Sequence, residues 1–368
     1  MVDIPHVTQP TDAGVARYVT ALCADQVARG WRVVVASPDG GRLATDLSSR
    51  GVRRITWHAG RNPGPRIGPE VLALRGLLKQ VRPSVVHLHS SKAGLAGRLA
   101  IRGRVPTLFQ PHGWSWLAAP ATTLPATLAW ERLAARWTSL YICVGRGEAD
   151  LGRAMALNGR YAVVRNGVDL EHFRPADERE KLAARAQLSI SHDAPLAVCV
   201  GRVTWQKGQD LLLRAWPVVR SRCRRAVLAL VGAGELRETL RRDAPPGVHF
   251  ADPVDDVRPW YAAADVVVLP SRWEGLPLTL LEALSVGRSV VGTDIAGIVE
   301  ALPPAAGSVV PPGDVVALAD AVSYRLCQPH VARAEGAAAA RYAEAEADVR
   351  RTHAAMAEVT ARVAGWST

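Results

Sequence analysis

Two glutamates in residues 270–283 (PSRWEGLPLTLLEA) stand where they could hold two parts of one extended ligand. Glu274 lies on a Gly-Pro turn, and Glu282 follows eight residues later on an apolar run that predicts a helix. Since a helix rises ~1.5 Å per residue, the second carboxylate would lie ~12 Å further along the axis. The helix N-terminus between them would offer unpaired N–H groups and a positive dipole end to a phosphate. The segment can therefore hold sugar, diphosphate and ribose in line, although two solvated surface glutamates would give the same pattern.

A second segment supplies two cations on a strand-to-helix loop. The apolar run 195–200 predicts a buried strand, and the loop 200–208 (VGRVTWQKG) carries Arg202 and Lys207 between two glycines. Such loops lie at the carboxyl edge of a parallel sheet, where α/β proteins bind their ligands. Arginine offers phosphate oxygens a planar fork, and lysine offers a compact charge. The two side chains could therefore neutralise a departing diphosphate.

The two segments together resemble the signature of the retaining glycosyltransferases of family 4, two-domain GT-B enzymes that use nucleotide sugars. Four further segments resemble the same family, namely 6–17, 86–94, 110–113 and 165–169. One position departs from the family pattern, because Ala13 stands where the first of two adjacent glycines is usual. Only Gly14 then keeps the backbone freedom that close approach to a phosphate needs.

The resemblance implies a role for each candidate residue. The implied donor-binding residues are Gly14, Arg202, Lys207, Glu274, Gly275, Leu276 and Glu282, and the implied catalytic residues are His112, Arg202, Lys207 and Glu274. Glu274 would bind sugar hydroxyls and Glu282 the ribose hydroxyls. Backbone N–H groups of Gly275 and Leu276 would bind the diphosphate.

The resemblance also implies retention by front-side attack, in which the leaving diphosphate accepts the acceptor's proton and the protein positions groups and stabilises charge. A glycosidase-like carboxylate pair is disfavoured, because Glu282 would lie far from the anomeric carbon. The pair Asp255-Asp256 is not the Asp-x-Asp pattern that holds a divalent metal, and no other cluster shows ligand spacing. We therefore expect no metal and no cofactor, with the nucleotide sugar as co-substrate.

Three histidines are further candidates. His112 follows a strand-like run and precedes Gly113, so we expect it at the carboxyl edge of a sheet. There the resemblance implies contact with the donor sugar. His87 and His89 alternate along a predicted strand, and we expect one in the core and the other near the cleft, with catalysis by neither.

Strand and helix patterns alternate along both halves of the chain, which predicts doubly wound parallel sheets. Strands are predicted at 4–8, 32–36, 55–57, 84–89, 107–110, 139–144, 161–165, 196–200, 226–231, 248–251, 265–270, 289–292 and 308–310, and helices at 14–29, 70–81 and 177–187. The expected architecture is GT-B, with two Rossmann-like domains facing across a cleft. The expected domains are an acceptor-binding domain at 1–169 and a donor-binding domain at 170–347, with a final helix at 348–368 packed back on the first.

The net charge of +11 has three interpretations. Nucleic-acid binding is the least favoured, because the basic residues are dispersed and lack a binding motif. Attraction to anionic membranes or lipid-phosphate acceptors is the second. Attraction of the nucleotide diphosphate donor is the third, and it is compatible with the second. We expect no nucleic-acid partner.

Residues 114–130 contain no charged side chain. Pro120, Pro125 and three threonines make this segment unsuited to crossing a membrane. Two interpretations stay open: a buried helix-loop beside the cleft, or a loop that meets the acceptor or the membrane through its tryptophans at 114, 116 and 130.

The five cysteines are widely spaced, without metal-ligand or redox spacing, and the first residues lack the basic region of a signal peptide. We therefore expect a cytoplasmic protein, with peripheral contact at the inner face of the membrane as an alternative. The expected function is retaining transfer of a hexosyl unit, from a UDP-sugar by preference, to a hydroxyl of a lipid-linked saccharide or natural product. A pseudo-glycosyltransferase joining cyclitols and a non-catalytic nucleotide-sugar-binding subunit are the alternatives.

Overall fold

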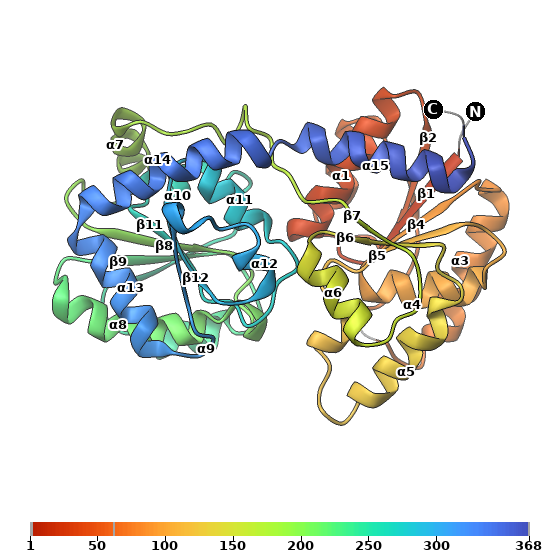
Figure 1. Cartoon of the computed structure of the whole chain (residues 1–368), viewed down its shortest axis with the longest axis horizontal. Helices are drawn as coiled ribbons and strands as arrows, with labels where there is room; N and C mark the ends of the chain where they lie inside the picture. Colours follow the sequence, from red (N-terminus) through yellow and green to blue (C-terminus); the bar gives the residue numbers. More distant parts are fainter. Residues whose placement is uncertain (1–2, 62, 367–368) are drawn as a thin grey trace. The chain divides into compact units, whose positions relative to one another are not determined.

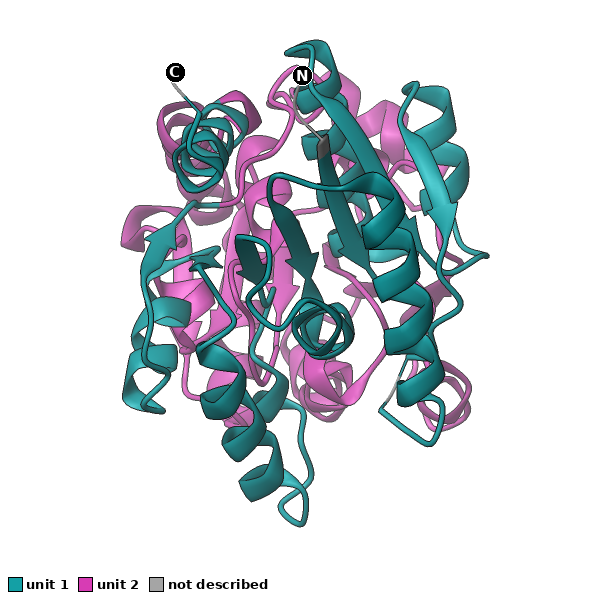
Figure 2. Cartoon of the chain, turned by 90° about the vertical axis from the view of Figure 1, so that its right-hand side faces the viewer, with its two compact units in different colours: residues 1–165, 351–368 teal, residues 166–350 magenta. Residues whose placement is uncertain are grey.

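A computed structural model describes residues 3–61 and 63–366 of the chain. The chain divides into two compact units, residues 1–165 with 351–368, and residues 166–350 (Figure 2). Within the described residues, each unit is built on one sheet in which every strand pairing is parallel (Figure 1). The strand orders are β3-β2-β1-β4-β5-β6-β7 and β10-β9-β8-β11-β12-β13, so each sheet is doubly wound.

The first sheet is formed by strands near the amino end of the chain. Its strands are β1 (Asp3–Thr8), β2 (Arg32–Ser37), β3 (Arg53–Thr56), β4 (Val86–His89), β5 (Thr107–Gln110), β6 (Leu140–Cys143) and β7 (Tyr161–Val163). The helices that accompany it are α1 (Ala13–Ala28), α2 (Leu43–Ser49), α3 (Ile67–Val81), α4 (Ser90–Ile101), η1 (Ser115–Leu117), α5 (Leu124–Ala135), α6 (Arg146–Ala154) and the last helix, α15 (Val349–Ala364).

The second sheet repeats the plan. Its strands are β8 (Leu196–Val200), β9 (Val227–Val231), β10 (Val248–Ala251), β11 (Val266–Leu269), β12 (Ser289–Thr293) and β13 (Gly307–Val310). Its helices are α7 (Glu178–Gln187), η2 (Trp205–Lys207), α8 (Gln209–Arg222), α9 (Arg237–Arg242), α10 (Arg258–Ala263), α11 (Leu278–Ser285), α12 (Ala296–Val299), η3 (Pro304–Ala306), α13 (Val315–Cys327) and α14 (Pro329–Glu346).

Every strand predicted from the sequence is present, with ends that differ by at most two residues. These strands were predictable because parallel strands covered on both faces consist of continuous apolar residues. The prediction of two doubly wound sheets is confirmed. The helix predicted at 70–81 begins earlier, at Ile67.

The two chain segments that link the units lie side by side within the second unit. Val168 forms a parallel bridge with Asp348, and Val349 N–H donates to the Val168 carbonyl over 3.0 Å. Gly167 packs against this pair so closely that a Cβ there would lie 2.7 Å from the Val349 backbone. A side chain at position 167 would therefore push the two segments apart.

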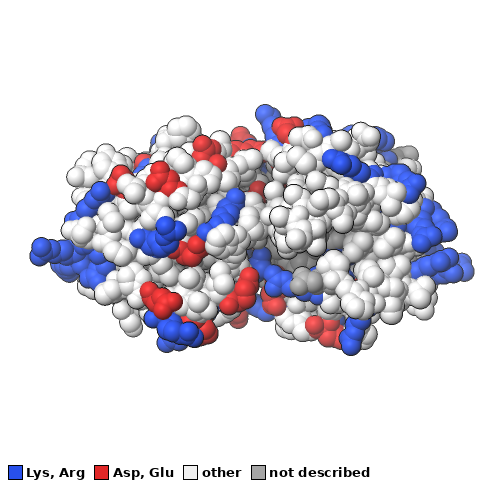
Figure 3. Space-filling model, turned by 90° about the horizontal axis from the view of Figure 1, so that it is seen from below, with Lys and Arg blue, Asp and Glu red and all other residues white. Residues whose placement is uncertain are grey.

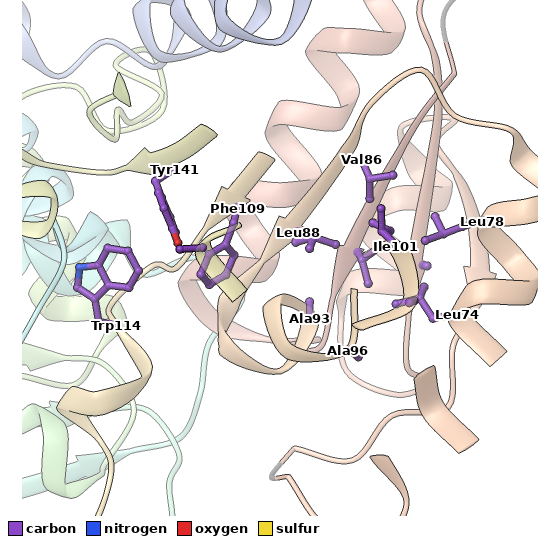
Figure 4. Packing of buried hydrophobic residues seen from close by; sticks show 14 of the residues in the cluster. Leu74, Leu78, Val86, Leu88, Ala93, Ala96, Ile101, Phe109, Trp114 and Tyr141 are labelled. Carbon is purple, nitrogen blue, oxygen red and sulfur yellow. The ribbon is translucent and has the colours of Figure 1, made fainter. Parts of the chain in front are cut away.

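Apolar side chains cover both faces of the first sheet. Figure 4 shows one face, where α3 and α4 pack on β4 and where Phe109, Trp114 and Tyr141 extend the cluster. Trp114 and Trp116 are 2% and 6% exposed, and their rings stack with centroids 4.5 Å apart. Both side chains belong to the core, which removes two of the three proposed membrane anchors. Most of residues 118–129 are exposed, so only the start of the segment 114–130 is buried.

Charged side chains of both signs are interspersed on the face seen in Figure 3. This agrees with the dispersed basic residues of the sequence. Among the helices of the described residues, none is both long enough and apolar enough to cross a membrane.

Candidate active site

The strand order of the second sheet reverses between β8 and β11, which are hydrogen-bonded neighbours. Ligands of doubly wound proteins bind outside the carboxyl ends of the strands at such a reversal. The loop after β8 carries Arg202 and Lys207, and the loop after β11 carries Glu274. The sheet topology therefore brings the two sequence-predicted segments to one edge.

Lys207 and Glu274 are in direct contact. The Lys207 Nζ atom lies 2.6 Å from Glu274 Oε1, and Ser271 Oγ donates to the same oxygen over 2.7 Å. The Glu274 side chain is 7% exposed and that of Lys207 is 17% exposed. An ammonium carries three donors, so Lys207 can bind a phosphate oxygen while it keeps Glu274 in place.

Two glutamines position the arginine of this site, and sequence reasoning did not single them out. Arg202 Nη2 donates to Gln206 Oε1 over 3.2 Å, and Gln206 Nε2 donates to the Trp273 carbonyl over 3.1 Å. Gln209 Nε2 holds the Arg202 carbonyl over 2.9 Å. Gln206 thus ties the Arg202 loop to the backbone next to Glu274.

The backbone conformation at position 208 explains why a glycine follows Lys207. Its φ of 68° lies in the left-handed region, and a Cβ there would lie 2.0 Å from the Pro270 carbonyl oxygen. Arg272 holds the same two loops together from another side, with a bidentate ion pair to Asp210 over 2.8 and 2.7 Å. Its guanidinium also lies 3.3 Å from the centroid of the Trp205 ring.

The turn Gly275-Leu276 is fixed through its carbonyl groups. Asn166 Nδ2 donates to the Leu276 carbonyl over 2.7 Å, and Gly297 packs where a Cβ would come within 2.1 Å of the Gly275 oxygen. The N–H groups of Gly275 and Leu276 donate to no acceptor among the described residues. They precede α11 and are available to an anion.

Glu282 is more deeply buried than the sequence suggested. It is 2% exposed, and its Oε2 atom accepts a hydrogen bond from the Tyr261 hydroxyl over 2.9 Å. Helix α11 begins only at Leu278, so helical rise accounts for about 6 Å of the path from Glu274 and not the ~12 Å that a helix over all eight residues would give. Residues 274–277 lie ahead of the helix, so helical rise alone does not set the separation of the two carboxylates.

In the first unit the strand order reverses between β1 and β4. The loop after β1 leads into α1, whose first residue, Ala13, has a φ of 61°. Gly14 is not among the residues with positive φ. The left-handed conformation of this loop therefore falls on the alanine, and close approach of a phosphate to Gly14 stays a prediction.

His112 follows β5 at the same edge of the first sheet and also has a positive φ, 52°, as does Gly113 with 99°. Glu148, which sequence reasoning missed, fixes this turn. Its two carboxylate oxygens accept from the N–H groups of Gly113, over 2.6 Å, and Val144, over 2.8 Å. Strained residues held by such contacts are typical of functional sites.

Three further histidines lie beneath His112. His6, His87 and His89 are all fully buried, so both His87 and His89 belong to the core. The expected place of one of them near the cleft stays a prediction. Burial lowers the pKa of His6 to about 4 and that of His112 to about 3, and it lowers the pKa values of His87 and His89 well below the usual range. All four rings are therefore neutral at neutral pH.

The nitrogens of His6, His87 and His89 lie within 4.8 Å of one another, a group that sequence spacing did not reveal and that could hold a metal ion. The geometry fits hydrogen bonding better. His6 Nδ1 and His89 Nε2 are 2.9 Å apart, whereas two nitrogens on a tetrahedral zinc are about 3.3–3.4 Å apart.

Two family models match the chain in succession: Glycosyltransferase Family 4 over residues 13–172, and Glycosyl transferases group 1 over residues 194–328. The chain belongs to the glycosyltransferase family that these two models describe. The resemblance seen in the sequence is thereby confirmed.

Curated relatives share about a third of their residues with the matched part of this chain. It is 30% identical over 240 residues to the UDP-Gal:alpha-D-GlcNAc-diphosphoundecaprenol alpha-1,3-galactosyltransferase of Escherichia coli, with 62% of each chain covered. It is 35% identical over 193 residues to the GDP-mannose-dependent monoacylated alpha-(1-6)-phosphatidylinositol monomannoside mannosyltransferase of Corynebacterium glutamicum, covering 49% of this chain and 51% of that protein. The chain thus spans between half and two thirds of the length of these relatives.

Solved structures show the same fold. Sucrose-phosphate synthase from Thermosynechococcus elongatus superposes with a TM-score of 0.84 at 21% identity, covering 99% of both chains. Anabaena HepE in complex with UDP and glucose gives 0.82 at 20% identity, covering 98% of this chain and 100% of that one. The two α/β units are therefore those of the GT-B architecture.

Proposed function

We propose that this protein transfers a hexosyl unit from a nucleotide sugar to an acceptor hydroxyl, with retention of anomeric configuration. The observation that carries the proposal is the contact between Lys207 and Glu274 at the strand-order reversal of the second sheet. It sets a cation for the leaving diphosphate beside a carboxylate for sugar hydroxyls, which are the two chemistries that a sugar diphosphate requires.

In this proposal Arg202 and Lys207 stabilise the negative charge that grows on the diphosphate as the glycosidic bond breaks. The N–H groups of Gly275 and Leu276 bind the same diphosphate at the start of α11. Glu274 binds the hexose and Glu282 the ribose. Gly14 and His112 are further donor-binding candidates in this proposal. These groups need no metal ion to neutralise the leaving group, and we propose a metal-independent reaction.

The acceptor we propose is a lipid-linked saccharide or a lipid-bound inositol. The names of the relatives from Escherichia coli and Corynebacterium glutamicum support it, since both act on acceptors joined to a lipid. They name different donor bases, uridine and guanosine. UDP-sugars remain our preferred donors, and a thermal-shift screen of UDP- and GDP-sugars distinguishes the two. Cytoplasmic location with peripheral membrane contact belongs to the same proposal.

Donor turnover by the purified protein tests the proposed function. We expect Arg202→Ala and Lys207→Ala each to lower turnover by at least a hundredfold, the usual effect of removing one donor that stabilises developing charge. Arg214→Ala is the matched control, because Arg214 is an exposed residue of α8 in the same unit. Circular dichroism checks the fold of each variant. Near-normal turnover in both site variants would overturn the proposal.

A further inference from the structure

Four side chains from separate elements form one hydrogen-bonded chain that ends at His112. His6 Nε2 lies 2.7 Å from Gln26 Oε1 on α1, and His6 Nδ1 lies 2.9 Å from His89 Nε2 on β4. His89 Nδ1 lies 3.1 Å from His112 Nε2. Gln26, His6 and His89 are fully buried, so water cannot replace any of these links.

The series of hydrogen bonds from Gln26 to His112 can run in only one donor-to-acceptor direction at a time. A neutral imidazole has one N–H donor and one lone pair, so a donor at one end of each ring requires an acceptor at the other. In the structure the amide oxygen of Gln26 faces His6 Nε2, and an amide oxygen only accepts, so His6 Nε2 donates to it. His6 Nδ1 then accepts from His89 Nε2, and His89 Nδ1 accepts from His112 Nε2.

The other titratable groups that face these hydrogen bonds do not change their donor-to-acceptor direction. His87 and Tyr18 lie against it, with ring centroids 3.9 Å from His89 and 5.0 Å from His112, respectively. Burial lowers the pKa of His87 and raises the pKa of Tyr18, so both remain neutral. Gln110 lies close to His87, yet neither side chain makes a hydrogen bond of ordinary geometry among the described residues.

We infer that Gln26, His6 and His89 are positioning residues that fix His112 as its Nε2–H tautomer, which leaves the Nδ1 lone pair to accept a hydrogen bond from a hydroxyl of the donor sugar. This inference rests on the proposed function for the identity of the ligand. It also makes a statement about specificity. A site built to accept from a hydroxyl disfavours sugars in which that hydroxyl is missing or replaced by fluorine.

Nitrogen NMR of the full chain labelled with ¹⁵N-histidine tests the tautomer directly, because protonated and unprotonated ring nitrogens have well-separated shifts. We expect His112 to carry its proton on Nε2 near neutral pH, with the signal assigned by comparison with His112→Asn. A proton on Nδ1 would overturn the inference. This measurement uses no substrate, so it stands even if no nucleotide sugar is turned over.

The variant Gln26→Leu tests the origin of the polarity. Without the amide oxygen, an N–H group at His6 Nε2 has no acceptor. His6 can then donate a hydrogen bond only from Nδ1, to His89 Nε2, and His89 Nδ1 in turn donates to His112 Nε2. We expect the His112 proton to move to Nδ1. Donor kcat/KM should fall by roughly two- to twelvefold, the equivalent of one neutral hydrogen bond, while UDP affinity is unchanged because UDP lacks the sugar.

Thr20→Val is the matched control, since Thr20 is a buried polar residue of the same helix whose hydroxyl has no hydrogen-bond partner among the described residues. It should leave both the tautomer and kcat/KM unchanged. Gln26→Met repeats the test with a more flexible side chain if the leucine variant is unstable. An unchanged His112 tautomer in folded Gln26 variants would refute the inference.

Discussion

Three buried histidines and the partly buried His112 should make the first unit sensitive to acid well before its carboxylates protonate. His6, His87, His89 and His112 are neutral in the folded protein because burial lowers their pKa values, to about 4 for His6 and about 3 for His112. In the unfolded chain each would take up a proton near pH 6.5. Below that pH the unfolded state binds more protons, so stability falls as the pH falls.

The size of the effect follows from proton linkage. Each histidine that stays neutral in the folded state lowers the unfolding free energy by about 1.4 kcal/mol per pH unit between pH 6.5 and its folded pKa. Four such rings give a slope of about 5 kcal/mol per pH unit. A typical domain has only about 5–15 kcal/mol of stability, so we expect the first unit to open near pH 5.

His87→Leu is the informative perturbation, because neither His87 nitrogen has a hydrogen-bond partner among the described residues. The variant should lose about a quarter of the slope without breaking a hydrogen bond. Hydrogen exchange of peptides from β1 and β4, corrected for intrinsic exchange, measures the opening free energy of this unit from pH 7.5 to 5. His58→Leu is the control, since the His58 side chain is 84% exposed. A flat wild-type profile, or an unchanged slope in His87→Leu, would refute the reasoning.

Three further predictions follow from the site. Ala13→Gly should stabilise the first unit by about 1 kcal/mol in denaturant unfolding, because the φ of 61° at Ala13 suits glycine; lower stability would argue against the left-handed conformation. Gly208→Ala should lower the free energy of unfolding by about 3 kcal/mol and abolish turnover, since the new Cβ would meet the Pro270 carbonyl. Its control, Gly313→Ala, lies in open space with a similar φ of 82° and should lower the free energy of unfolding by about 1 kcal/mol. EDTA should leave turnover intact, and loss of activity restored by Mg²⁺ or Mn²⁺ would disprove metal independence.

Local sequence patterns predicted the sheets because several of their strands are unbroken apolar runs, such as LAVCV in β8 and VVVL in β11. They also predicted that Arg202, Lys207 and Glu274 gather, since each follows a parallel strand and the carboxyl ends of such strands meet at one edge. The contact of Lys207 with Glu274 follows from this topology, because β8 and β11 are neighbours and their loops leave the sheet at the same edge.

Contacts that join distant elements were not predictable from local pattern. The histidine chain draws one residue from each of α1, β1, β4 and the loop after β5, and no spacing along the sequence relates Gln26 to His112. The hydrogen bonds of Glu148 to the N–H groups of Gly113 and Val144 likewise join separate elements. The left-handed conformation at Ala13 was also not predictable, because glycine is its usual carrier.

The central claim is that a nucleotide sugar lies along residues 274–282, with its sugar at Glu274 and its ribose at Glu282. Calorimetry with UDP tests it most directly, because UDP contains the ribose and lacks the sugar. We predict that Glu282→Gln weakens UDP binding by about 1.5–3 kcal/mol, roughly 10- to 150-fold in Kd, through loss of a charge-assisted hydrogen bond. Tyr261→Phe is the control for the Glu282 contact with Tyr261. Glu274→Gln should leave UDP affinity unchanged and lower kcat. Weaker UDP binding in Glu274→Gln with normal binding in Glu282→Gln would contradict the account.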